Sequence, residues 1–159
     1  MNWYKKAEAA TVSVTPEEFG AMDWDEKRAL AENRGITPAT QLLFFTEEYE
    51  DKDVALWDLA GNPNLTPEVQ RLFITQEYWG KHWALRALTD NPSIHPEVQP
   101  LFFTQKYDNK DEVLRALASN HSFLRDFTLK QLLQIKKVAR GGMRLLVLSK
   151  RLEQIAGVS

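Results

Sequence analysis

The sequence contains no cysteine. This absence excludes disulfide bonds, thiolate zinc sites, cysteine-ligated iron–sulfur clusters and a cysteine nucleophile. Long apolar runs are missing too, since no segment approaches the roughly 18 consecutive apolar residues of a membrane-spanning helix. Glu8 interrupts the N-terminal stretch where a signal peptide would need its apolar region. We therefore expect a soluble, cytoplasmic protein that does not enter a membrane.

Patterns that indicate catalysis or metal binding are also lacking. There is no glycine-rich phosphate loop and no GxSxG motif. The three histidines, His82, His95 and His121, never approach the spacing of metal ligands. Asp58 stands beside Trp57, but a lone carboxylate on a helix is more typical of a solvated surface than of a catalytic base. The sequence thus predicts no enzyme activity, no metal site and no cofactor.

What is present suits one globular unit with an uneven charge. The chain has 159 residues, of which 43% are hydrophobic and 26% are charged, enough to bury a core in a single domain. The net charge is -2, but residues 124–159 carry eight basic and two acidic side chains. The other residues carry twelve basic and twenty acidic side chains. An acidic body therefore precedes a basic C-terminal segment.

One phrase occurs twice, as NPNLTPEVQRLFITQEY from Asn62 and as NPSIHPEVQPLFFTQKY from Asn91. Asparagine recurs at a constant interval of 29 residues, at Asn33, Asn62, Asn91 and Asn120. Other positions keep one residue type at the same interval: Gln41, Gln70 and Gln99; Leu43, Leu72 and Leu101; Phe44, Phe73 and Phe102; Thr46, Thr75 and Thr104; Tyr49, Tyr78 and Tyr107; Lys52, Lys81 and Lys110. Such a period indicates that one structural unit recurs.

Each unit contains signals for two helices. Residues 53–60 predict a first helix, which Gly61–Asn62–Pro63 ends because proline cannot continue the hydrogen-bond ladder. A second helix is expected at Thr66–Pro67–Glu68, where threonine caps the free amides and proline fits the first turn. The expected apolar stripes are Ala55, Leu56, Leu59 and Ala60 on the first helix and Val69, Leu72 and Phe73 on the second.

Such helical hairpins cannot bury their apolar faces alone, so we expect an all-α fold in which they stack as a right-handed α-solenoid. The third unit departs from the pattern, since His95 replaces the capping threonine and Pro100 should delay or kink the second helix. We expect one domain: an N-terminal cap over residues 1–23, repeats over 24–123 and basic capping helices over 124–159. A final helix is expected in the segment MRLLVLSKRLEQIA, from Met143.

The phrase LA.NP.LTPEV resembles the short HEAT-like helical repeats, including those called variant leucine-rich repeats. The resemblance covers about residues 16–128 and implies an α-solenoid. Its members include protein-binding scaffolds and alkylpurine DNA glycosylases. One variant type carries an iron–sulfur module, which the absence of cysteine excludes here.

Columns that change their chemistry should face water. Trp57 shares a column with Arg28, Arg86 and Arg115, and tryptophan and arginine are enriched at interface hot spots. Helical spacing places Trp83 near Arg86, and stacking should bring Trp57 beside Arg86. The candidate protein-binding residues are Arg28, Trp57, Trp79, Trp83, Arg86 and Arg115. A purely structural interpretation stands beside this one: the arginines pair with carboxylates between units, and Trp57 packs over an arginine stem.

The remaining constant columns have simpler interpretations. The tyrosine and threonine columns should provide packing and hydrogen bonds between repeats. The column of Lys52, Lys81 and Lys110 lies at a turn between units, where solvated helix ends explain it best.

The leading hypothesis is a non-enzymatic module or scaffold that binds another protein through a surface lined by tryptophan and arginine. The alternative is nucleic-acid binding by the basic segment, because such charges can hold phosphates. The residues of this alternative are Lys130, Lys136, Lys137, Arg140, Arg144, Lys150 and Arg151. The same segment could instead complement an acidic protein, or the acidic body of a second copy in a homo-oligomer.

Overall fold

The computed structural model describes residues 11–119 and 128–138, and within these ranges it is all-helical. The one β-type pairing in the same ranges is an isolated parallel bridge between Val12 and Ile36. The predicted all-α class is therefore confirmed for this part of the chain. The expected final helix from Met143 lies outside the described residues.

The helices are short, and most of them span nine residues. In chain order they are α2 (Pro16–Ala21), α3 (Trp24–Glu32), α4 (Pro38–Thr46), α5 (Lys52–Ala60), α6 (Pro67–Thr75), α7 (Lys81–Thr89), α8 (Leu101–Thr104), α9 (Lys110–Ala118) and α11 (Leu129–Val138). Helices α4 and α6 begin 29 residues apart, as do α5, α7 and α9.

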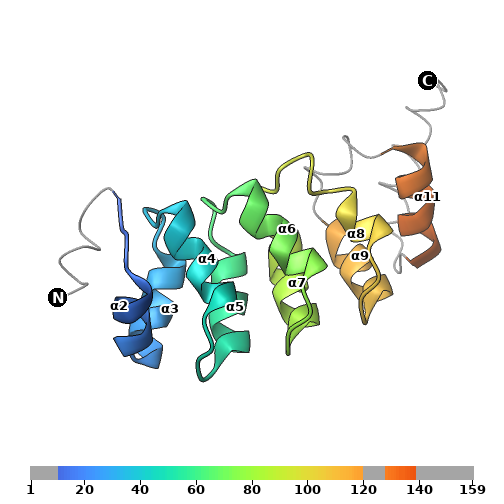
Figure 1. The fold of residues 1–159 in the computed structure, drawn as a ribbon. Coiled ribbons are helices and arrows are strands. Elements are labelled where there is room, and N and C mark those ends of the chain that lie inside the picture. Colours follow the sequence, from blue (N-terminus) through green and yellow to red (C-terminus); the bar gives the residue numbers. More distant parts are fainter. Residues whose placement is uncertain (1–10, 120–127, 139–159) are drawn as a thin grey trace.

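The helices lie in two rows (Figure 1). Helices α3, α5, α7 and α9 contact one another in sequence and form one row, which α11 extends; α4, α6 and α8 form the other. Helix α4 also packs on α5, α6 on α7 and α8 on α9. The apolar faces of the two rows of helices therefore meet along the described part of the chain.

The helix starts follow the sequence signals. Thr37 and Thr66 accept a hydrogen bond from the third residue of α4 and of α6, and a proline opens both helices. The predicted start at Thr66–Pro67 and the predicted end of α5 before Gly61 are both confirmed.

The core is a series of fully buried phenylalanines, Phe19, Phe44, Phe73 and Phe102, with aliphatic residues between them. The predicted stripe of α5 is buried throughout, and Val69 and Phe73 of α6 are fully buried. Leu72, however, is only partly buried, since it lies at the edge of the core.

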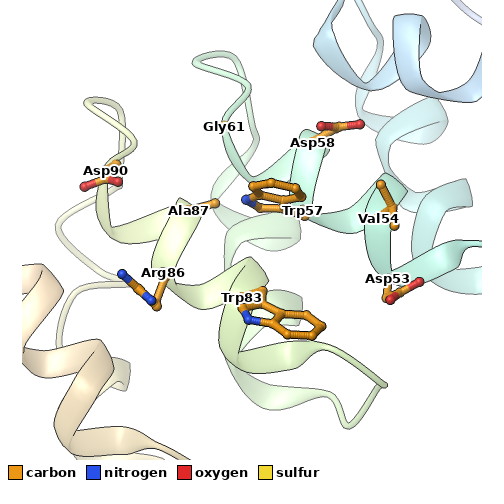
Figure 2. A pocket seen from close by; sticks show the side chains of 9 residues that line it. All are labelled: Asp53, Val54, Trp57, Asp58, Gly61, Trp83, Arg86, Ala87 and Asp90. Atoms are coloured by element: carbon orange, nitrogen blue, oxygen red, sulfur yellow. The ribbon is translucent and has the colours of Figure 1, made fainter. Parts of the chain in front are cut away.

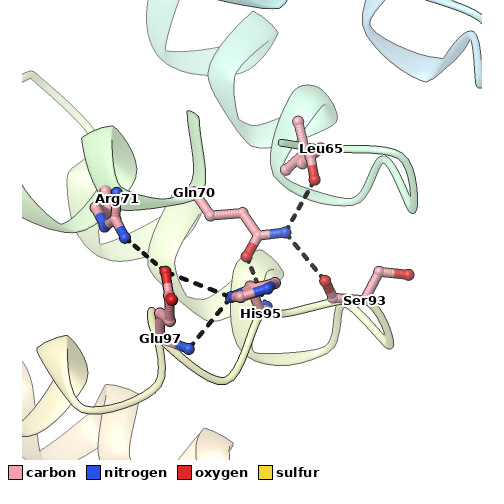
Figure 3. A network of polar contacts seen from close by, with 6 residues as sticks. All are labelled: Leu65, Gln70, Arg71, Ser93, His95 and Glu97. Carbon is pink, nitrogen blue, oxygen red and sulfur yellow. Dashed lines mark hydrogen bonds and ion pairs between the residues drawn. The ribbon is translucent and has the colours of Figure 1, made fainter. Parts of the chain in front are cut away.

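Side-chain amides join each helical pair to the next. Asn91 donates from Nδ2 to the carbonyls of Ala60 and Asn62, both at 2.9 Å, and Asn62 donates equivalently to Ala31 and Asn33. Gln70 is directed the other way along the chain (Figure 3): it donates to Ser93 O at 3.0 Å and accepts from the amide of His95 at 2.8 Å. Asn62 and Asn91 therefore bond to the preceding helical pair, whereas Gln70 bonds to the following one.

Helix α8 begins later than its counterparts, as predicted from Pro100. It starts at Leu101 and has four residues, whereas α6 has nine. Pro100 has no amide hydrogen for the helical ladder, so residues 96–100 form turns instead. His95 therefore does not cap a helix, since the N-cap of α8 is Pro100; its Nδ1 accepts the amide of Glu97 at 3.3 Å, within the turns.

The lysine column was interpreted wrongly. These side chains do not extend into solvent: Lys52 donates to the carbonyls of Phe45 and Glu47, both at 2.8 Å, and Lys110 donates to those of Phe103 and Gln105. Lys81 is buried and pairs with Glu77 at 2.9 Å. Lysines 52 and 110 satisfy the exposed carbonyls at the end of the preceding helix, a favourable place for a cation.

The tyrosine column has a mixed role. Each hydroxyl donates to a carbonyl five residues earlier in its own unit: Tyr49 to Phe44, Tyr78 to Phe73 and Tyr107 to Phe102. The rings pack between units, since Tyr49 contacts Phe19 and Tyr78 contacts Phe45 edge to face. The predicted packing between units is confirmed for these two rings, but the hydrogen bonds are internal to each unit. In the threonine column, Thr75 likewise bonds within its helix, to Arg71 O at 2.9 Å.

Candidate functional site

A groove of about 820 Å³ runs along the outer face of the row, between α5 and α7 (Figure 2). Helix α5 contributes one wall and α7 the other. The residues that line it are Asp53, Val54, Trp57, Asp58, Gly61, Trp83, Arg86, Ala87 and Asp90.

The neighbouring seams of the same row are crossed by ion pairs. Arg28 of α3 donates through Nε to Asp58 of α5 at 2.9 Å, and Arg86 of α7 donates to Glu112 of α9 at 3.1 Å. The predicted pairing of these arginines with carboxylates between units is therefore confirmed for Arg28 and Arg86.

The seam between α5 and α7 cannot form such a pair. The carboxylates lie 30 residues after Arg28 and 26 residues after Arg86. Counted from Trp57, which occupies the arginine column, these offsets fall on Ala87 and Trp83. Both residues line the groove, and neither can accept an ion pair. Residue changes on both sides of the seam thus replace an ion pair with an apolar surface.

Both indoles of the groove are accessible. Trp57 is 53% exposed and Trp83 is 51% exposed, so about half of each ring is available to a ligand. Figure 2 shows the two rings on facing walls, with Arg86 directed away from Trp83. The predicted proximity of Trp57, Trp83 and Arg86 is therefore observed, but the guanidinium is engaged by Glu112 rather than by an indole.

The charged side chains of the groove that have no ion-pair partner among the described residues are acidic. Arg28 neutralises Asp58, and Glu112 neutralises Arg86. Burial raises the pKa of the Asp58 carboxyl above its ordinary value, although the Arg28 guanidinium opposes this shift. No ion pair or side-chain hydrogen bond within residues 11–119 and 128–138 engages Asp53 or Asp90. These two carboxylates stand at opposite ends of the groove (Figure 2).

The turn before α7 extends this surface. Trp79 is 81% exposed and lines a hollow with Glu48, Asp53 and Glu77. Gly80 follows in the left-handed conformation, with φ of 76°, and a Cβ there would stand 2.9 Å from the Cβ of Asp53. This glycine lets the turn lie close against α5. Because Asp53 lines both cavities, the groove and the Trp79 hollow form one continuous surface.

The other predicted binding residues lie outside the groove. Arg28 lies on the neighbouring seam, with its guanidinium 5.2 Å from the centroid of the Trp24 ring. Arg115 is half-buried on α9. Of the basic segment, the structure shows Lys130, Lys136 and Lys137, all exposed on α11. The remaining four residues, Arg140, Arg144, Lys150 and Arg151, lie outside the described residues.

Six lining residues were not anticipated as parts of a site: Asp53, Val54, Asp58, Gly61, Ala87 and Asp90. Ala87 could have been found from the sequence, because it lies 30 residues after Trp57, as Asp58 lies 30 residues after Arg28. The aspartates carry no such signal, since single acidic residues on helices are common on any surface.

Comparison with protein-family models, curated proteins and solved structures gave no match. In the part of the chain that the structure covers, no helix has both the length and the apolar character needed to span a bilayer. Across that same part, no group of three histidine or carboxylate side chains converges as potential metal ligands.

Proposed function

We propose that this protein is a non-enzymatic interaction module, a HEAT-like α-solenoid of 29-residue repeats with atypical capping ends, whose α5–α7 groove receives another protein. The recurring helix boundaries and the asparagine and glutamine bonds between successive pairs support the repeat architecture. They also make the scaffold stiff, because each pair is joined to its neighbour by buried amides.

One observation carries the binding function. The groove seam has apolar residues at the positions where adjacent seams carry an ion pair, and it exposes two indoles. Exposed indoles are a cost to a free protein, because they leave apolar surface in water. At interfaces, by contrast, tryptophan anchors are among the largest contributors to affinity. The groove is therefore best explained as a docking surface.

The test is to rebuild the seam with the chemistry of its neighbours. In the variant Trp57→Arg/Trp83→Glu, the arginine and the glutamate have the same spacing as Arg86 and Glu112. We expect the variant to keep its helicity, because both positions are half exposed, and to lose capture of the partner from an extract of the source organism. Glu68→Ala on α6, an exposed position away from the groove, is the control and should capture as the wild type does. Equal capture by the rebuilt variant would contradict the proposal.

Nucleic-acid binding through the basic segment is the alternative function. Three exposed lysines on α11 favour it. A titration with single-stranded and duplex DNA at two salt concentrations tests it, since affinity from phosphate contacts must fall steeply as salt rises. Loss of this binding in Lys130→Ala/Lys136→Ala/Lys137→Ala would assign the function to α11 rather than to the groove.

A further inference from the structure

The charge and shape of the groove restrict what can occupy it. Its apolar part is made by Trp57, Trp83, Val54 and Ala87, and its unpaired charges are the carboxylates of Asp53 and Asp90. An acidic ligand would be repelled, and a purely apolar ligand would desolvate the carboxylates without replacing their hydrogen bonds. The complementary ligand combines an apolar stem with a cationic head.

Arginine and lysine side chains have this construction. Their methylene stems can lie against the indoles, the cation can interact with the ring face, and the head can reach a carboxylate. Arginine suits the site better, because its planar guanidinium can stack on an indole and also bond a carboxylate with two donors.

The length of the groove sets the spacing between two such side chains. Its lining on α5 runs from Asp53 to Gly61, which is about 12 Å at 1.5 Å per helical residue. An extended chain covers this distance in about four residues, at about 3.3 Å per residue. Side chains of an extended chain alternate between its two faces, so residues four apart lie on the same face and can enter the groove together.

The neighbouring hollow adds an exposed indole and shares Asp53 with the groove. Around Trp79 stand the carboxylates of Glu48, Glu77 and Asp53. Lys52 pairs with Glu48 at 3.4 Å and Lys81 pairs with Glu77 at 2.9 Å, so within the described part of the chain the unpaired carboxylate of this hollow is again that of Asp53. The aromatic surface thus continues beyond the groove, while the unpaired negative charge stays at Asp53 and Asp90.

We propose that the groove binds an extended basic segment of a protein partner, with two arginine or lysine side chains about four residues apart, one near Asp53 and one near Asp90. This inference rests on the proposed docking function and specifies the chemistry of the partner.

A defined peptide tests the inference without knowledge of the partner. The probe is a six-residue peptide with blocked ends that contains two arginines separated by three alanines, and its match replaces both arginines with neutral citrulline. Binding to the full chain is measured by calorimetry at low and at physiological salt. We expect the arginine peptide to bind about tenfold more tightly than the citrulline peptide. The difference should shrink as salt rises.

The protein variants locate the site. Asp53→Asn/Asp90→Asn should weaken binding of the arginine peptide about tenfold. Glu17→Gln/Glu68→Gln removes the same net charge at exposed positions on α2 and α6, and it should leave binding unchanged. Thermal melts should show that both variants remain folded.

Several results would overturn the inference: equal binding of the two peptides, no effect of Asp53→Asn/Asp90→Asn, or an equal loss in the Glu17→Gln/Glu68→Gln control. A dimer in sedimentation that dissociates in the Asp53→Asn/Asp90→Asn variant would also overturn it, because the groove would then belong to a second copy. Failure of the inference can be separated from failure of the proposed function. If the arginine peptide does not bind but Trp57→Arg/Trp83→Glu still loses its partner, the docking function stands and only the basic chemistry is wrong.

Discussion

The inner and outer positions of the helical rows follow different rules. Toward the core, successive units repeat the same residues, such as Phe44, Phe73 and Phe102, and bury them equally. On the outer face, one column holds arginine at Arg28 and Arg86 but tryptophan at Trp57, and the seam at Trp57 opens into the groove. The comparison indicates that the constant columns maintain the stack, whereas the one divergent seam is available for binding.

The largest expected contrast is between an inner and an outer aromatic residue. Phe73→Ala should lower the free energy of unfolding by about 3–5 kcal/mol, because it leaves a cavity in a fully buried site. Trp57→Ala removes a larger ring, but this ring is half exposed, so we expect a loss of about 1 kcal/mol or less. Urea denaturation of both variants measures the difference, and equal losses would remove the distinction between the two faces.

Alkaline pH should lower the free energy of unfolding through the tyrosines that pack against the core. Burial raises the pKa of Tyr49, Tyr78 and Tyr107 well above the ordinary value of about 10. The folded state therefore keeps these protons while the unfolded chain releases them. The stability that depends on the three neutral tyrosines is complete below pH 10 and is lost as the pH rises further. Three such groups give a slope of up to about 4 kcal/mol per pH unit.

Two lysines, the buried Lys27 and the partly buried Lys110, act in the opposite direction at slightly lower pH. Burial lowers the pKa of Lys27 and Lys110, so their contribution to stability grows as the pH approaches about 10.4 and is constant above it. The tyrosine effect is therefore cleanest between about pH 10.5 and 12. Absorbance at 295 nm, recorded together with circular dichroism, should show these tyrosines ionising only as the helices unfold. Ionisation that precedes unfolding would contradict the assignment.

The hydrogen bonds that the buried asparagine side chains make between helical pairs should have the next largest effect on the free energy of unfolding. Asn91→Ala leaves the buried carbonyls of Ala60 and Asn62 without this donor, and we expect it to cost about 2–3 kcal/mol. Asn64→Ala is the matched comparison: Asn64 also donates to a carbonyl of the preceding unit, that of Arg34, but this bond is exposed to water, so its loss should cost less than about 1 kcal/mol. Similar melting temperatures for the two variants would show that the buried amides do not hold the units together.

The smallest expected effect concerns the irregular third unit. Pro100→Arg introduces the residue found at the equivalent Arg71 and restores the missing amide donor. Helix α8 should then extend back toward Pro96 and raise stability by about 1 kcal/mol. Circular dichroism at 222 nm should show the gain in helicity. An unchanged spectrum would mean that the turns over residues 96–100 are set by tertiary contacts instead.

Much of the fold could be predicted because its signals are local and recur. Thr66–Pro67 and Gly61–Asn62–Pro63 mark helix ends through their own backbone chemistry, and Pro100 predicted the late start of α8. The lysine column was misread because a lysine stem can fold back over the preceding turn, and position along the chain does not fix that direction. The buried asparagines were recognised as a period and, at Asn62, as part of a helix end, but not as donors between units, since their carbonyl partners lie in the preceding unit.

The candidate site was predictable only in part. Helical spacing related Trp83 to Arg86, because residues three or four apart share a face, and the repeat column together with the expected stacking of units identified Trp57. It could not identify Asp53 and Asp90, since their membership of the groove depends on how α5 and α7 face each other. The same limit explains why Arg28 and Arg115 were grouped with Trp57: they share its column, but their seams have different neighbours.

The buried amides have a consequence for how such a protein can change in length. Each asparagine needs only the carbonyls of the preceding helical pair, and each glutamine only the backbone of the next. An in-frame duplication of residues 62–90 would therefore meet complementary groups at both of its junctions. Lengthening the array therefore requires no new kind of interface between units.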